Sequence, residues 1–85
     1  MKPKEFREIR ERMGLTQKEI AEILGLSGYI PVNHYESGFR SPSSLIMALM
    51  RIFDEWPEKK STELREEIKA QTAKVNKAKR KQKDA

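Results

Sequence analysis

The stretch TQKEIAEILGLSGYIPVNHYESG, residues 16–38, holds two short helical patterns on either side of a glycine turn. Thr16 and Glu19 have the spacing of a capping box, in which each side chain accepts a hydrogen bond from a backbone N–H at the helix start. The apolar residues that follow at helical spacing are Ile20, Ile23 and Leu24. Gly25 then suits the left-handed position that ends many helices. We therefore predict a short, well-capped helix here.

The second helical pattern contains a proline, Pro31. The residue before a proline is disfavoured in the α region and adopts an extended conformation, as a helix N-cap does. Proline itself is favoured at the first helical position. We therefore predict Ile30 as a weak N-cap without a side-chain acceptor, and Pro31 as the first helical residue. Val32 and Tyr35 would face inward, and Gly38 would end the helix.

Two further helices flank this pair. Pro3 suits the first position of an N-terminal helix that ends at Gly14, with an apolar face of Phe6, Ile9 and Met13. After the pair, Ser41 is the expected cap and Pro42 the first residue of a fourth helix that Pro57 stops. Its expected apolar face is Leu45, Leu49, Ile52 and Phe53. We expect Met47 and Met50 outside the core, where they could meet a second subunit.

The composition fits one small all-α domain. The chain has 85 residues, of which 36% are hydrophobic and 36% charged, and no stretch alternates with the period of a strand. We assign residues 1–57 to a compact four-helix domain and residues 58–85 to a further helix and a basic, partly disordered tail. The absence of cysteine excludes disulfides and thiolate metal sites. Without a long apolar run, we expect a soluble, cytoplasmic protein.

The basic charge is concentrated in one segment. The net charge is +5, yet residues 69–83 contain seven bases and no acid, which leaves 11 bases and 12 acids in the first 68 residues. Basic chains of this size meet nucleic acid, anionic membranes or acidic partners. Because the first 68 residues are close to neutral, a nucleic-acid function for them must rest on their pattern.

The segment from residue 61 onward allows three interpretations. Ser61 or Thr62 can cap a helix, and a weak heptad stripe follows at Leu64, Ile68, Gln71, Val75 and Ala78. The favoured interpretation is a solvated helix that rests Leu64 and Ile68 on the domain. The alternatives are a dimerising helix and plain disorder. We expect the last eight or so residues to be disordered in every case.

Residues 16–36 meet the requirements of a helix-turn-helix, in which one helix braces across the DNA backbone and the next enters the major groove. The segments REIRERMGLTQKEIAEILGLS and YESGFRSPS resemble the lambda-repressor-like helix-turn-helix family (phage-repressor, Cro and xenobiotic-response-element types, and antitoxin regulators) over residues 5–53. The residues that carry the resemblance are Arg10, Gly14, Leu15, Thr16, Gln17, Ala21, Gly25, Glu36, Gly38 and Pro42. Between Gly25 and Glu36 this chain is one residue longer than the family pattern.

The resemblance implies specific roles. The base-reading positions are Tyr29, Ile30, Asn33 and His34, of which Asn33 suits adenine and His34 a guanine edge. The family's phosphate-contacting glutamine falls on Gln17, and the residues that could hold phosphate around it are Lys18, Ser37, Arg40, Ser41 and Ser43. The resemblance also implies that Glu36 is structural and pairs with Arg10. For two of the base-reading positions an ordinary interpretation stays open: Tyr29 covering the turn and His34 lying on the surface.

Three functions follow in order of preference. With one histidine, no cysteine, no zinc ligands and no carboxylate pair on a pocket, we expect neither an enzyme nor a bound cofactor or metal. The first interpretation is a transcriptional regulator, a repressor that binds an inverted repeat in double-stranded DNA as a homodimer. The second is an antitoxin-type autoregulator whose segment 61–85 binds a partner protein. The third is a module whose tail holds RNA or an acidic protein.

Overall fold

The structure is a computed structural model that describes the backbone of residues 2–83 and the side chains of residues 2–78. It consists of five α-helices, and the described residues contain no strand. The helices are α1 (Pro3–Arg12), α2 (Gln17–Leu24), α3 (Tyr29–Ser37), α4 (Ser44–Glu55) and α5 (Glu58–Lys83). The expected all-α fold is confirmed.

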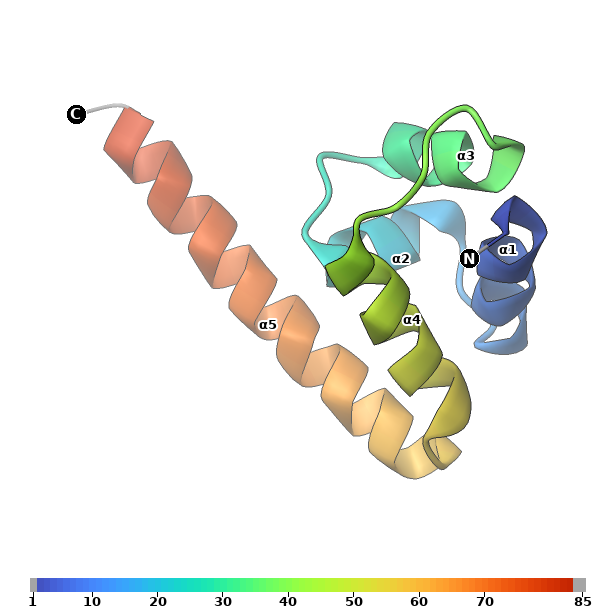
Figure 1. Cartoon of the computed structure of the whole chain (residues 1–85). Helices are drawn as coiled ribbons and strands as arrows, with labels where there is room; N and C mark the ends of the chain where they lie inside the picture. The colour runs from blue at the N-terminus through green and yellow to red at the C-terminus, as the bar shows by residue number, and fades with distance from the viewer. Residues whose placement is uncertain (1, 84–85) are drawn as a thin grey trace.

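The first four helices enclose a small apolar core, and α5 runs along one side of them (Figure 1). The buried hydrophobic side chains are Phe6, Ile9, Ile20, Ala21, Ile23, Val32, Met50 and Phe53. The α2 helix contacts both α3 and α5, while α1 contacts α3 and α4. Consequently α2 is packed from two sides, and α3 lies on it at the surface, as a helix-turn-helix requires.

Both predicted ends of α2 are confirmed. Thr16 Oγ1 accepts from the Glu19 amide at 3.1 Å and Glu19 Oε1 accepts from the Thr16 amide at 3.0 Å, which is the complete capping box. At the other end Gly25 has a φ of 72°, in the left-handed region that favours glycine. The left-handed conformation of Gly25 therefore fixes the backbone direction in which the turn into α3 begins.

The predicted start of α3 was wrong by two residues. Gly28 is the N-cap, with extended backbone and no side-chain cap, and Tyr29 and Ile30 are already helical. Pro31 is thus the third helical residue. This position suits proline because the first four N–H groups of a helix have no intrahelical partner, so a missing N–H costs nothing there. The bias of Ile30 toward extended backbone is overridden here, where Val32, two residues further along the helix, is fully buried.

The predicted start and apolar face of α4 also need correction. Ser43, not Ser41, is the N-cap, because its hydroxyl accepts from the Ile46 amide at 3.2 Å. Helical residues spaced by four and three then place Ile46, Met50 and Phe53 over the core. Met50, expected outside the core, is fully buried. Leu45, expected inside, is 69% exposed because it lies off this line at the helix start.

The fifth helix begins earlier than expected and belongs partly to the core. It starts at Glu58, so Ser61 lies in its second turn and does not cap it. Ser61 is buried and its hydroxyl donates to the Phe53 carbonyl at 2.8 Å. Within α4 that carbonyl would accept from residue 57, which is a proline without an N–H. Ser61 therefore satisfies a buried carbonyl that the Pro57 break leaves unpaired.

The favoured interpretation of the segment after residue 61 is confirmed, since Leu64 and Ile68 pack against the core as part of a helix. The helix is described as far as Lys83, so the expected disorder is not found for residues 78–83. Residues 84–85 lie outside the described part of the chain. In Figure 1 the C-terminal part of α5 extends past the other helices.

Candidate nucleic-acid interface

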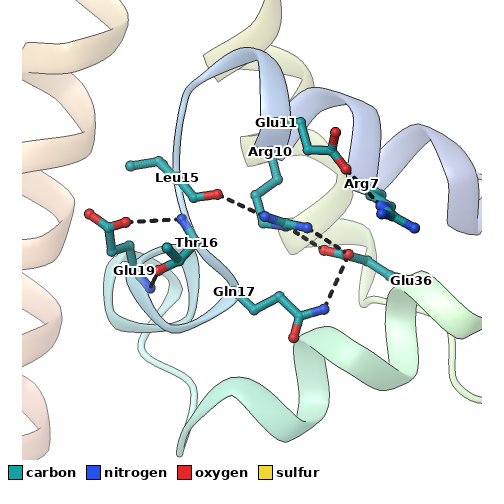
Figure 2. Close-up of polar contacts among 8 residues, drawn as sticks. All are labelled: Arg7, Arg10, Glu11, Leu15, Thr16, Gln17, Glu19 and Glu36. Carbon is teal, nitrogen blue, oxygen red and sulfur yellow. Dashed lines mark hydrogen bonds and ion pairs between the residues drawn. The ribbon is translucent and has the colours of Figure 1, made fainter.

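A buried polar cluster joins α1, α2 and α3. Arg10 Nε donates to Glu36 Oε2 at 2.7 Å and Arg10 Nη2 donates to Glu36 Oε1 at 3.0 Å. Arg10 Nη1 donates to the Leu15 carbonyl at 2.8 Å, and the Gln17 amide donates to Glu36 Oε1 at 3.2 Å. Figure 2 shows these side chains converging between the three helices. The pairing of Arg10 with Glu36 and the structural role of Glu36 are confirmed.

The cluster fixes where α3 lies. The side chains of Arg10 and Glu36 are only 12% and 6% exposed, and the hydrogen bond to Glu36 is the main cause that raises the pKa of Arg10. A shielded ion pair is stable only when its hydrogen bonds are complete. No buried side-chain nitrogen or oxygen of the described residues lacks a partner. The orientation of α3 against α1 and α2 is therefore set by a bidentate, fully bonded contact.

The opposite side of α3 faces outward. Val32 is fully buried and Tyr35 packs edge-on against Phe6, with ring centroids 5.6 Å apart. At about 100° per residue, the residues on the other side of the helix share one surface. We call this set the α3 face: Tyr29, Ile30, Asn33, His34 and Ser37. The structure thus brings all four predicted base-reading residues together on one exposed face.

Within the α3 face the side chains differ in exposure. Tyr29 and Ile30 are each 55% exposed at the start of the helix. Asn33 is exposed one turn later, and His34 is half-buried. The earlier helix start places Tyr29 and Ile30 in the first turn of α3 itself.

Phe39 was missed by the sequence analysis and adjoins this face. It is 71% exposed, its ring lies 4.8 Å from that of His34, and the Arg40 guanidinium lies 5.9 Å from its ring centre. The Arg40 amide donates to the His34 carbonyl at 3.2 Å, which folds the chain back on the end of α3. The result is an exposed stack of His34, Phe39 and Arg40. The only signal in the sequence was a large apolar residue inside the polar segment ESGFRSPS.

The predicted phosphate-contacting residues lie at helix ends and in the loop after α3. Gln17 and Lys18 are the first two residues of α2, and Ser43 is the N-cap of α4. Ser37 donates to the His34 carbonyl, and Arg40 and Ser41 follow in the exposed loop. Gln17 is engaged with Glu36 through one N–H of its amide, and the second N–H of that amide can donate to a phosphate.

The described residues contain neither a membrane-crossing helix nor a group of metal ligands. Among residues 2–83 no helix is long and apolar enough to cross a membrane. The same part of the chain has no group of three or more histidine, cysteine, aspartate or glutamate residues placed to hold a metal ion.

Comparison with known proteins gives one match. The family model described as the antitoxin component of bacterial toxin-antitoxin systems, MqsA, matches residues 1–69, which include all of α1–α4 and the first half of α5. Members of this family have a DNA-binding domain of the helix-turn-helix type. No similar curated protein and no similar solved structure was found. The chain therefore belongs to the MqsA family of antitoxin components.

Proposed function

We propose that this protein is an antitoxin-type autoregulator that binds an operator in double-stranded DNA through the α3 face. The observation that carries the proposal is the α3 face itself, four candidate base-reading residues on one exposed side of a helix whose other side is locked into the domain. A helix of this kind fits the major groove of B-DNA, where each base pair presents a distinct pattern of donors and acceptors. Antitoxin-family membership supports this interpretation over a stand-alone repressor.

The roles within the α3 face follow from side-chain chemistry. Asn33 offers the donor and acceptor pair that adenine matches, and His34 offers one ring nitrogen to a guanine edge. Tyr29 and Ile30 offer apolar contact to thymine methyl groups. Gln17, Lys18, Ser37, Arg40, Ser41 and Ser43 would hold the flanking phosphates, which fixes register without selecting sequence.

The proposal includes a homodimer and a protein partner. One α3 face covers only a few base pairs, and two copies of the chain would bind half-sites about one helical turn apart. The partner is the toxin component, bound through the α5 segment that starts near residue 61. None of these roles needs catalysis, a metal or a cofactor, and we propose that the protein has no enzymatic activity.

The test is selection of binders from a random duplex DNA library with the full chain and with Asn33→Ala. Asn76→Ala, the same change on α5, is the matched control. We expect the wild type and the control to enrich one inverted repeat. The loss of a bidentate base contact weakens binding by about 1–3 kcal/mol, so Asn33→Ala should bind that repeat about 5- to 150-fold less tightly and accept other bases at one position.

Two results would contradict the proposal. Absence of any enriched motif with the wild-type chain would show that it does not recognise a sequence. An unchanged motif and affinity with Asn33→Ala would show that α3 does not enter the major groove in the proposed way.

A further inference from the structure

The face of α5 that packs on the core continues past the core. Leu64 and Ile68 pack against the apolar cluster, and the Thr72 hydroxyl donates to the Glu22 carbonyl at 3.2 Å, near the end of α2. Val75, on the same side of α5 and one turn further, is 52% exposed. We call Ile68, Gln71, Val75 and Ala78 the α5 stripe. Its spacing of three and four residues is that of a helix that binds in a groove.

A groove lies beside the stripe. It has a volume of about 360 Å³ and is lined by Leu24, Gly25, Glu67, Ile68, Gln71, Thr72, Val75 and Asn76. Because Gly25 has no side chain, α5 approaches the end of α2 closely: a Cβ atom there would lie 3.2 Å from the Thr72 methyl group. The surface therefore combines a protruding helix with an adjoining apolar hollow.

The surroundings of the stripe are basic. Residues 69–83 carry seven bases and no acid. Lys69 lies 3.4 Å from Glu22, and Lys74 and Lys77 are exposed on the parts of the helix outside the stripe. An apolar centre with a charged rim is the composition of many protein–protein interfaces. Glu22 offsets the charge of Lys69, and Glu67 lines the groove, so the positive part of the rim is the part that carries Lys74 and Lys77. The surface complementary to that part is acidic.

We propose that the α5 stripe and its groove dock an acidic surface with an apolar centre on the toxin component. This inference rests on the proposed antitoxin function and adds the location and chemistry of the partner site. DNA is the other polyanion available, but phosphates would match only the lysines. Bound phosphates would leave Val75 and the apolar groove exposed to water. A protein surface with an apolar centre and an acidic rim would bury the groove and also pair with the lysines.

The test compares two single charges added to the same helix of the full chain, Val75→Asp in the stripe and Ala70→Asp outside it. Ala70 is exposed and lies about 140° around the helix from Val75. Binding of each variant to the purified toxin component of the same system, and to operator duplex, is measured by calorimetry. Far-ultraviolet circular dichroism and thermal unfolding check that both variants keep the fold.

We expect Val75→Asp to weaken toxin binding about tenfold or more, and Ala70→Asp to change it by less than about threefold. Operator affinity should be the same for the two variants. Equal toxin affinities for both, or no toxin binding by the wild-type chain, would overturn the docking site. A loss confined to operator DNA would also overturn it and would assign α5 to DNA.

These outcomes separate the docking site from the proposed DNA function. The docking site fails on the toxin titration with Val75→Asp. The operator function fails on the library selection with Asn33→Ala. Either result leaves the other standing.

Discussion

The α3 face and the distal half of α5 are both exposed, but they are held in place by different means. The α3 helix is nine residues long, and the side that faces the domain is held by Val32 and by the ion pair of Arg10 with Glu36. Beyond Thr72, α5 continues for 11 residues, about 16 Å of helix. The described side chains of that segment, residues 73–78, are all exposed.

This difference separates two kinds of mutational effect. A change beneath α3 should lower the free energy of unfolding and DNA affinity together, because one short helix carries both the binding face and the core residue Val32. A change on distal α5 should alter binding and leave stability unchanged. The predictions below test this separation, from the largest expected effect to the smallest.

The largest effect is expected from breaking the buried ion pair. Arg10→Ala leaves Glu36 charged and shielded from water, and we expect the free energy of unfolding to fall by about 3–5 kcal/mol. Urea denaturation of the full chain measures it. The double variant Arg10→Met, Glu36→Leu, which leaves no unpaired charge, should recover most of this loss. A loss below about 1 kcal/mol in the single variant would show that the pair does not fix α3.

The next effect concerns the hydroxyl that joins α4 and α5. Ser61→Ala removes the donor to the Phe53 carbonyl, which has no helical partner because residue 57 is proline. A buried carbonyl left unpaired costs about 1–3 kcal/mol, which urea denaturation will detect. Ser44→Ala, an exposed serine at the start of α4, is the control and should change little. If both variants unfold alike, the start of α5 does not belong to the cooperative fold.

A smaller effect is expected from the exposed stack next to α3. Phe39→Ala removes the ring that contacts His34 and Arg40, and pairs of this kind contribute about 0.5–1.5 kcal/mol. Because these contacts hold His34 and Arg40 in place for DNA, we expect operator affinity to fall about 2- to 13-fold. The free energy of unfolding should fall by no more than the contacts contribute, since Phe39 is mostly exposed. Phe39→Tyr should retain most of the affinity. A large fall in stability would instead identify Phe39 as a packing residue.

Local rules of the sequence predicted the parts of the fold that depend on neighbouring residues. The capping box of Thr16 and Glu19 and the left-handed Gly25 follow from short-range backbone chemistry, and both are present. The pair of Arg10 and Glu36 is 26 residues apart in sequence. It was predicted only through the family resemblance, since spacing cannot bring such residues together.

The errors arose where a distant contact decided the outcome. Pro31 was placed at the start of α3 by a local rule, but the whole first turn tolerates proline, because its N–H groups have no intrahelical partner. Met50 and Leu45 changed places because the packing of α4 depends on which helices cover it. Phe39 was overlooked because it belongs to no sequence motif. Its role was recognised only from its contacts with His34 and Arg40 in the structure.

The smallest effect concerns the pH dependence of the cap of α2. Hydrogen bonds from Thr16, from its backbone first and then its side chain, lower the pKa of Glu19 below its ordinary value of 4.5. A carboxylate whose pKa is lower in the folded state contributes its stability above the unfolded pKa and loses it as pH falls through the folded pKa.

Glu19→Gln keeps an acceptor for the Thr16 amide but does not titrate. The free energy of unfolding of the wild type relative to this variant should therefore be constant from pH 7 to about pH 5 and then decline toward pH 3. Urea denaturation across this range measures the difference, and the decline should be smaller in a Thr16→Ala background. A flat difference down to pH 3 would show that the ionised form of Glu19 does not stabilise the start of α2.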